Sequence, residues 1–180
     1  MVKPADTITF SHDFERALSQ ILKWEGARAD IVGDRGGRTN MGITQATFSA
    51  WLRDTGQPDR DVFGLTRIEA EVIYWRNYWQ PVAEGHAWPL NVVLFDVAVN
   101  NGRGRVAPTN GAKVRSWLYA ARAGTTNSTP RLPTVLALRI LALRERFYRL
   151  LALAPAQRQF LNGWLNRNND LRAFIQDNPR

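Results

Sequence analysis

The stretch WEGARADIVGDRGGRTNMGIT, residues 24–44, says more about the fold of this chain than any other segment. A carboxylate, Glu25, follows a run of residues with helical spacing, and a polar, glycine-rich run follows Glu25. A carboxylate between the end of a helix and a tight turn is well placed for chemistry. We therefore expect the functional site of the chain to lie in this stretch.

The residues before Glu25 predict a helix that begins at Ser11. Ser11 is a suitable N-cap, apolar residues recur at helical spacing after it, and Gly26 is placed to end the helix. The apolar stripe consists of Phe14, Ala17, Leu18, Ile21 and Leu22. Glu25 falls on the same stripe, so we expect its side chain to face the core or a cleft rather than open water.

This position of Glu25 is compatible with two roles. A carboxylate away from water resists ionisation, and a glutamate that keeps its proton near neutral pH can protonate a leaving group. The structural alternative is a glutamate paired with an arginine, or a helix-end glutamate that turns to solvent. The spacing alone leaves both roles open.

The residues after Glu25 favour the catalytic role. Asp30 and Asp34 follow within ten positions, and residues 36–44 have the glycines and alternating small and polar residues of a short β-hairpin. Hydrolysis of a glycosidic bond needs an acid and a second group, commonly a carboxylate, that positions water or stabilises positive charge on the sugar. Glu25 together with Asp34 or Asp30 supplies such a pair.

These residues resemble the pattern of glycoside hydrolase family 108, a family of muramidases that includes phage endolysins and secretion-linked lysozymes. The match continues in later blocks, residues 74–81, 95–102, 146–148 and 160–164, and together these cover nearly the whole chain. The first block carries the most specific part of the resemblance: Glu25-Gly26, Asp34, Gly36-Gly37, Thr39-Asn40 and Gly42-Ile43-Thr44. Ala27 and Arg28 replace the Gly-Tyr usual in the family, so sugar contacts of this loop are expected to differ.

The resemblance implies roles for particular residues. It implies that Glu25 is the general acid, that Asp34 aligns with a family aspartate and assists it, and that Thr39 or Thr44 helps to place a water molecule. Asp30 stands where asparagine is usual and is expected to contact substrate. The further residues expected to contact the glycan are Thr44, Tyr78, Asn100 and Asn101. No cofactor is expected.

Composition narrows the functional classes. The chain has 180 residues, of which 44% are hydrophobic, enough for one well-filled core. It contains no cysteine, so disulfides and thiolate metal sites are excluded, and its two histidines, His12 and His86, are too far apart in sequence to suggest a metal cluster. Neither a nucleophile elbow nor a phosphate-binding glycine motif is present.

Charge is unevenly distributed. Residues 1–100 carry 10 Lys and Arg against 13 Asp and Glu, whereas residues 101–180 carry 14 against 3. The second half is thus strongly basic and suits an anionic partner such as a wall polymer, outer-membrane lipid or nucleic acid. Arginines that are simply solvated on helix surfaces are the neutral alternative.

Helices are expected through most of the remaining chain. Thr44 is expected to cap one helix, and the capping box from Thr66 to Glu69 opens another that must end before Pro81. Residues 89–101 are apolar nearly all round and predict a central helix, in which Asp96 is expected to be satisfied by an arginine or a helix N-terminus. Residues 135–153 and a segment from Pro155 predict two final helices.

We therefore expect a mainly α, lysozyme-like helical bundle with a small β-hairpin lobe. Residues 1–180 are expected to form a single domain, with the catalytic part at about 10–125 and peptidoglycan-binding helices at about 133–178. The first residues lack an apolar stretch, so we expect no signal peptide. The enzyme would then be made in the host cytoplasm and act in the periplasm or cell wall with the help of a membrane-permeabilising partner.

The expected function is an N-acetylmuramidase that cleaves the β-1,4 bond between N-acetylmuramic acid and N-acetylglucosamine, as in a bacteriolytic phage endolysin. A lytic transglycosylase, which needs one acid and no water, is the enzymatic alternative. The other alternative is a basic helical module that binds wall polymer or nucleic acid without cutting; its features are the basic second half and the segment Arg115-Ser116-Trp117. Binding of nucleic acid is not expected for the hydrolase.

Overall fold

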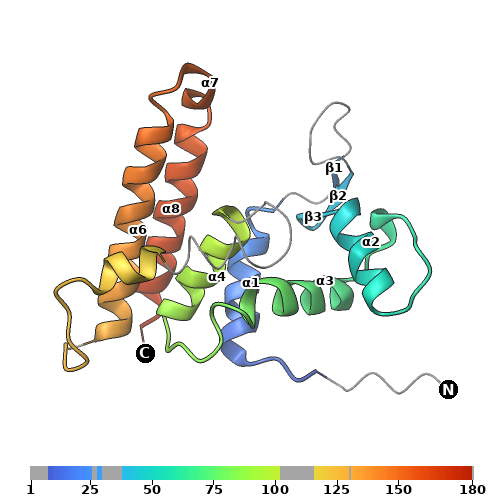
Figure 1. The fold of residues 1–180 in the computed structure, drawn as a ribbon, viewed down its shortest axis with the longest axis horizontal. Helices are drawn as coiled ribbons and strands as arrows, with labels where there is room; N and C mark the ends of the chain where they lie inside the picture. The colour runs from blue at the N-terminus through green and yellow to red at the C-terminus, as the bar shows by residue number, and fades with distance from the viewer. Residues whose placement is uncertain (1–7, 26–27, 30–37, 102–115, 130, 180) are drawn as a thin grey trace. The chain divides into compact units, whose positions relative to one another are not determined.

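The computed structural model describes residues 8–25, 28–29, 38–101, 116–129 and 131–179 (Figure 1). The chain divides into two compact units, residues 1–76 and 77–180, which we describe in turn. The N-terminal unit contains α1 (His12–Leu22), β1 (Arg28–Ala29), β2 (Thr39–Asn40), β3 (Ile43–Thr44), α2 (Gln45–Asp54), η1 (Val62–Gly64) and α3 (Arg67–Tyr74). The C-terminal unit contains α4 (Leu90–Asn101), a short helix at residues 116–122, α6 (Leu132–Leu151), α7 (Pro155–Arg158) and α8 (Leu161–Asp177).

Helix α1 begins as its sequence predicts. The Ser11 hydroxyl accepts a hydrogen bond from the backbone N–H of Phe14 at 3.2 Å. The apolar stripe is buried through Phe14, Ala17, Leu18 and Ile21. The helix ends at Leu22, however, and Trp24 N–H donates to the Ile21 carbonyl in a tighter final turn. Glu25 therefore lies in the bend that follows the helix rather than on its stripe.

The predicted hairpin is present and forms part of a three-stranded antiparallel sheet in the order β1-β2-β3. Asn40 pairs with Ile43, so a two-residue turn, Met41-Gly42, joins β2 to β3. Both turn residues have positive φ, 49° and 72° respectively. Positive φ at both positions is the conformation of a type I′ turn, whose twist matches that of the flanking strands.

Helix α2 follows the hairpin directly. The Thr44 hydroxyl accepts a hydrogen bond from Thr47 N–H at 3.2 Å and caps the helix, as predicted. Gln45 then connects this helix to η1, because its side-chain amide donates to the Arg60 carbonyl and its side-chain oxygen accepts from Val62 N–H. The Asn40 side chain donates to the Val62 carbonyl at 3.1 Å in a buried position. These polar contacts fasten the hairpin to the rest of the N-terminal unit.

Helix α3 begins with the predicted capping box. Thr66 accepts from Glu69 N–H, and the Glu69 carboxylate accepts from Thr66 N–H. Five residues of π-helix, η2 (Trp75–Trp79), follow directly. In a π-helix the backbone hydrogen bonds join residues five apart rather than the four of an α-helix. The residue that follows Tyr74 on the buried side is therefore Trp79, whereas Tyr78 is only partly buried.

Helix α4 is the centre of the C-terminal unit. Residues 90–99 are all buried, as expected for a helix that is apolar nearly all round. Helix α6 packs against α4, and α8 packs against α6, so that α6 and α8 run side by side with α7 at one end of the pair (Figure 1). The last predicted helix is thus two helices, the short α7 at Pro155 and the longer α8.

The mainly α, lysozyme-like fold with a small antiparallel lobe is confirmed. Among the described residues, no helix is both long enough and apolar enough to span a bilayer. The prediction of a single domain stays a prediction.

Candidate active site

Glu25 lies against the turn of the hairpin. A Cβ atom added to Gly42 would lie 2.5 Å from Glu25 Oε2 and 2.9 Å from Glu25 Cδ, so the carboxylate occupies the space beside the Gly42 backbone. The side chain is only partly buried. Glu25 thus keeps contact with solvent while one side of its carboxylate is covered by the turn.

Gly42 is the residue that makes this approach possible. It has φ of +72°, a conformation that L residues rarely adopt, and any side chain there would overlap the Glu25 carboxylate. The turn brings this glycine to the end of α1 because β2 and β3 pair on either side of it. The backbone geometry and the missing side chain are therefore both needed at position 42.

Tyr74 is the second side chain at this turn. Its hydroxyl donates a hydrogen bond to the Met41 carbonyl at 3.0 Å, and it would lie 2.6 Å from a Cβ at Gly42. The ring is buried in the core of the N-terminal unit. Tyr74 therefore anchors the turn from the core of the N-terminal unit, and its hydroxyl lies on the same side of Gly42 as the Glu25 carboxylate.

The two threonines predicted at the site both lie on the hairpin. Thr39 in β2 pairs with Thr44 in β3, and both are partly buried. The Thr44 hydroxyl is already used as the cap of α2 and also lies 3.0 Å from the Thr47 hydroxyl. The structure thus brings Glu25, Thr39 and Thr44 into one unit, with the Glu25 carboxylate and the Tyr74 hydroxyl both beside the Gly42 turn.

The other predicted site residues lie elsewhere in the chain. Asp30 and Asp34 are outside the described residues, and so is the side chain of Asn101. Tyr78 lies in η2 and is partly buried. The Asn100 amide donates to the Asp96 carboxylate at 3.0 Å and to the Asp96 carbonyl at 2.8 Å. The roles of these residues stay predictions.

Asp96 is satisfied by arginines, as its sequence context predicts. It is buried on α4 and pairs with Arg144 from α6 and with Arg167 from α8, the latter at 3.1 Å. Arg144 Nε in turn donates to the Asn168 side chain at 2.7 Å. Burial acts to raise the pKa of Asp96, but the two guanidinium groups outweigh it and hold the pKa below its ordinary value. This cluster joins the three long helices of the C-terminal unit.

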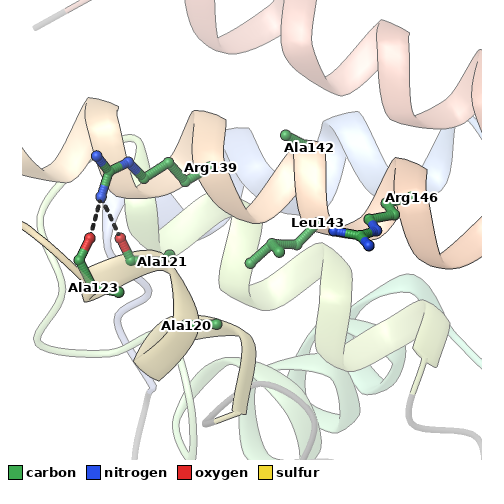
Figure 2. A pocket seen from close by; sticks show the side chains of 7 residues that line it. All are labelled: Ala120, Ala121, Ala123, Arg139, Ala142, Leu143 and Arg146. Atoms are coloured by element: carbon green, nitrogen blue, oxygen red, sulfur yellow. Dashed lines mark hydrogen bonds between the residues drawn. The ribbon is translucent and has the colours of Figure 1, made fainter.

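A pocket of about 410 Å³ lies in the C-terminal unit, between the helix at 116–122 and α6 (Figure 2). Its walls are mostly methyl groups, and Arg139 closes one side by donating to the carbonyls of Ala121 and Ala123 at 3.0 and 2.8 Å. None of its lining residues is a predicted site residue. The lining consists of Ala120, Ala121, Ala123, Arg139, Ala142, Leu143 and Arg146.

Sequence reasoning missed Tyr74 and Gly42 as parts of the site. Tyr74 lies in an aromatic run, residues 74–79, in which the resemblance implied a role for Tyr78 instead. The available signal was chemical: a tyrosine on a buried helical face needs a partner for its hydroxyl. Within the part of the chain that the structure describes, no group of three or more potential ligands could hold a metal ion.

Comparison with known proteins gives a family match and a similar fold. Residues 18–102 match the family model of glycosyl hydrolase 108, and this segment contains every predicted site residue. The fold is similar to that of SagA from Brucella abortus, with a TM-score of 0.64 and 26% identity over 91% of this chain and 94% of that chain. A search of curated proteins gave no match. The resemblance inferred from the sequence is thereby confirmed, and so is the glycoside hydrolase class.

Proposed function

We propose that the protein is a lysozyme-like peptidoglycan hydrolase, which the match of residues 18–102 to glycosyl hydrolase family 108 supports, and that Glu25 is its general acid. The observation that carries this proposal is the contact between the Glu25 carboxylate and Gly42 in the hairpin turn. It gives one acidic side chain a fixed place at the end of a helix, beside a polar hairpin. General acid catalysis requires such a fixed donor within reach of the leaving oxygen.

In the proposed reaction, Glu25 protonates the glycosidic oxygen between N-acetylmuramic acid and N-acetylglucosamine. The bond from the anomeric carbon to that oxygen breaks, and positive charge develops on the sugar ring. Asp34 stabilises that charge or orients a water molecule, and Thr39 or Thr44 helps to place the water. Asp30, Tyr78, Asn100 and Asn101 are proposed to contact the glycan. These residues act on the substrate without a cofactor.

Replacing Glu25 by glutamine tests the assignment. Glu25→Gln keeps the shape of the side chain but removes the acid, so the protein should fold with an unchanged melting temperature and release no fragments from purified peptidoglycan. General acid catalysis contributes typically about 10²–10⁴-fold to rate, so a loss of at least about 100-fold is expected. Glu15→Gln, an exposed residue in the first turn of α1, is the matched control. A Glu25→Gln protein with full activity would remove Glu25 from the role.

Analysis of the products separates hydrolysis from lytic transglycosylation. Hydrolysis leaves a reducing N-acetylmuramic acid end, whereas transglycosylation leaves an anhydro end because the sugar itself supplies the nucleophile. We expect reducing ends. Anhydro ends would show that the enzyme is a lytic transglycosylase. Glu25 would still be the acid, but Asp34 would have no water molecule to position.

We also propose that the enzyme lyses bacteria in a phage infection cycle, from its resemblance to the endolysins of the family. In this setting a separate membrane-permeabilising partner gives it access to the wall, and the basic second half attracts it to anionic envelope polymers. Expression inside bacteria tests this role: lysis should follow only when a permeabilising protein is expressed as well. Lysis by the enzyme alone would rule out the need for such a partner.

A further inference from the structure

Helix α6 has a side on which leucine and arginine alternate at helical spacing. Arg139, Leu143, Arg146 and Leu150 are separated by four, three and four residues and therefore share one face. Arg139, Arg146 and Leu150 are exposed, and Leu143 is partly buried. This face is thus both basic and apolar, and the helix at 116–122 lies against its Arg139 end.

The apolar character becomes stronger where α6 ends. Four of the seven exposed large hydrophobic side chains among the described residues fall between positions 150 and 160: Leu150, Leu151, Leu153 and Phe160. Leu153, in the turn before α7, is 71% exposed. These residues occupy the end of the α6–α8 pair that carries α7 (Figure 1). A cluster of exposed apolar side chains marks an interaction surface more often than chance exposure.

The charge of the same region is one-sided. Between residues 139 and 160 the exposed arginines are Arg139, Arg146, Arg149 and Arg158, and the only acidic residue is Glu145, which pairs with Arg149 at 2.8 Å. Arg139 is held by two backbone carbonyls. Arg146 and Arg158 have no acidic partner among the residues that the structure describes. The region therefore presents uncompensated positive charge beside exposed leucines.

The apolar pocket opens on this same face. Leu143 and Arg146 line it (Figure 2). The exposed Leu150 follows one turn further along α6. The hollow is walled by methyl groups, with the Arg146 guanidinium at its edge. Its chemistry, apolar inside and cationic at the rim, matches that of the leucine and arginine stripe.

We propose that the α6–α7 surface, defined as Leu143, Arg146, Leu150, Leu153, Arg158 and Phe160, docks onto an anionic lipid bilayer. Leucine and phenylalanine side chains at a helix end insert into the boundary between headgroups and acyl chains, while arginines bind the anionic headgroups. A second copy of this chain fits less well, because a symmetric contact would place arginines against arginines. A glycan strand would leave the leucines without an apolar partner. The inference goes beyond peptidoglycan hydrolysis and does not depend on the role of Glu25.

Vesicle sedimentation tests this proposal with the full chain. The wild-type protein should sediment with vesicles of phosphatidylglycerol and phosphatidylethanolamine and stay in solution with vesicles of phosphatidylcholine alone. Each surface arginine contributes roughly fivefold to binding of an anionic membrane, so Arg146→Gln/Arg158→Gln should weaken binding by about 25-fold. The control is Arg53→Gln/Arg76→Gln, which changes two exposed arginines elsewhere in the chain. It should bind the anionic vesicles at least about tenfold more tightly than Arg146→Gln/Arg158→Gln does.

The apolar contribution has a closely matched pair of variants. Leu153 and Ile68 are 71% and 72% exposed, but only Leu153 belongs to the proposed surface. Leu153→Ser should lower vesicle binding about threefold and Leu150→Ser/Leu153→Ser on the order of tenfold, whereas Ile68→Ser should bind as the wild type does. All variants should hydrolyse short soluble glycan fragments at the wild-type rate, which separates this inference from the proposed function.

Several outcomes would overturn the proposal. Equal sedimentation of the wild-type protein with neutral and anionic vesicles, or no sedimentation with either, would exclude an anionic bilayer as the partner. This result needs no variant and so does not depend on whether a variant folds. An equal loss in Ile68→Ser and Leu153→Ser would exclude this surface. If the protein does not bind vesicles but forms a dimer that Leu153→Ser dissociates, the surface belongs to a contact with a second copy. If it does not bind vesicles but binds insoluble peptidoglycan, and Leu153→Ser abolishes that binding, the surface belongs to a contact with the wall.

Discussion

At the scale of single residues, the hydrogen atom that Gly42 carries in place of a side chain decides where the Glu25 carboxylate can lie. The carboxylate approaches the Gly42 backbone so closely that a methyl group would overlap it. Tyr74 supports the same turn through its hydrogen bond to Met41. The proposed acid is thus positioned by two residues that carry no acidity of their own.

Gly42→Ala is expected to reduce hydrolysis far more than it reduces stability. The new methyl group would displace the Glu25 carboxylate, and a displacement of about 1 Å at a catalytic group can cost about 100-fold in rate. The φ of +72° adds roughly 1 kcal/mol of strain to an alanine. The measurements are peptidoglycan hydrolysis and thermal unfolding.

Gly56→Ala is the matched control for this change. Gly56 has φ of +70°, but nothing lies within 4 Å of its added Cβ, so the strain is the same and the displacement of Glu25 is absent. Gly56→Ala should lower the melting temperature by a similar amount and leave hydrolysis intact. Equal loss of activity in both variants would mean that strain, and not the place of Glu25, limits the enzyme.

Tyr74→Phe is expected to loosen the turn. It removes the hydroxyl that donates to Met41 at 3.0 Å, and the loss of such a bond costs about 1 kcal/mol of unfolding free energy. Because the turn then holds Glu25 less firmly, kcat should fall more than KM changes. Tyr119→Phe, at an 83% exposed position, is the control and should alter neither. Unchanged kcat in Tyr74→Phe would show that the turn keeps its place without this bond.

At the scale of elements, the Asp96 cluster connects α4, α6 and α8. One buried carboxylate faces two guanidinium groups and accepts a hydrogen bond from the Asn100 amide, while the Asn168 amide oxygen accepts from Arg144. Removing one partner from a buried ion pair leaves an uncompensated charge, which is far more costly than the loss of a surface pair. The cluster therefore determines how firmly the three helices hold together.

Asp96→Asn is expected to destabilise the protein by about 3–5 kcal/mol near neutral pH. The pKa of Asp96 is lowered in the folded state. A carboxylate with a lowered pKa stabilises the fold fully above its unfolded pKa, near 4, and loses this contribution as pH falls through the folded pKa. The difference in unfolding free energy between wild type and variant should therefore be largest near neutral pH and shrink below about pH 4.

Denaturant unfolding at several pH values measures this difference. Glu145→Gln is the control, since its pair with Arg149 is exposed on one helix and contributes less than about 1 kcal/mol. A difference between wild type and Asp96→Asn that stays constant down to strongly acidic pH would show that packing, rather than the ionised carboxylate, provides the stabilisation.

The elements show what sequence alone can predict. The caps at Ser11 and Thr44, the capping box at Thr66 and the arginine partner of Asp96 follow from local rules and are confirmed. The end of α1 and the π-helical turn after α3 do not follow from those rules. In an α-helix the residue on the same face one turn after Tyr74 would be Tyr78, whereas in the π-helix it is Trp79. The contact of Glu25 with Gly42 depends on chain segments 17 positions apart and could not be read from spacing.

At the scale of the whole molecule, the formal net charge of +8 predicts strong salt dependence on large anionic substrates. Salt screens charges separated by more than about 10 Å at 0.1 M, so added salt weakens attraction to a wall while leaving short-range contacts at the site in place. Hydrolysis of intact cell walls should fall several-fold between low and physiological salt. Hydrolysis of short soluble glycan fragments should change little, and an equal fall on both substrates would attribute the effect to the folded enzyme itself.

The π-helical turn at Trp75–Trp79 also constrains how the chain can change length. The π-helix holds one residue more than an α-helical turn would, so deleting one residue between Tyr74 and Trp79 would restore the four-residue spacing and leave Trp79 beside Phe95, whose ring centre lies 5.4 Å away. A homologue that is one residue shorter at this turn should therefore carry its aromatic residue four positions after the tyrosine. Homologues of equal length here should keep the tryptophan itself.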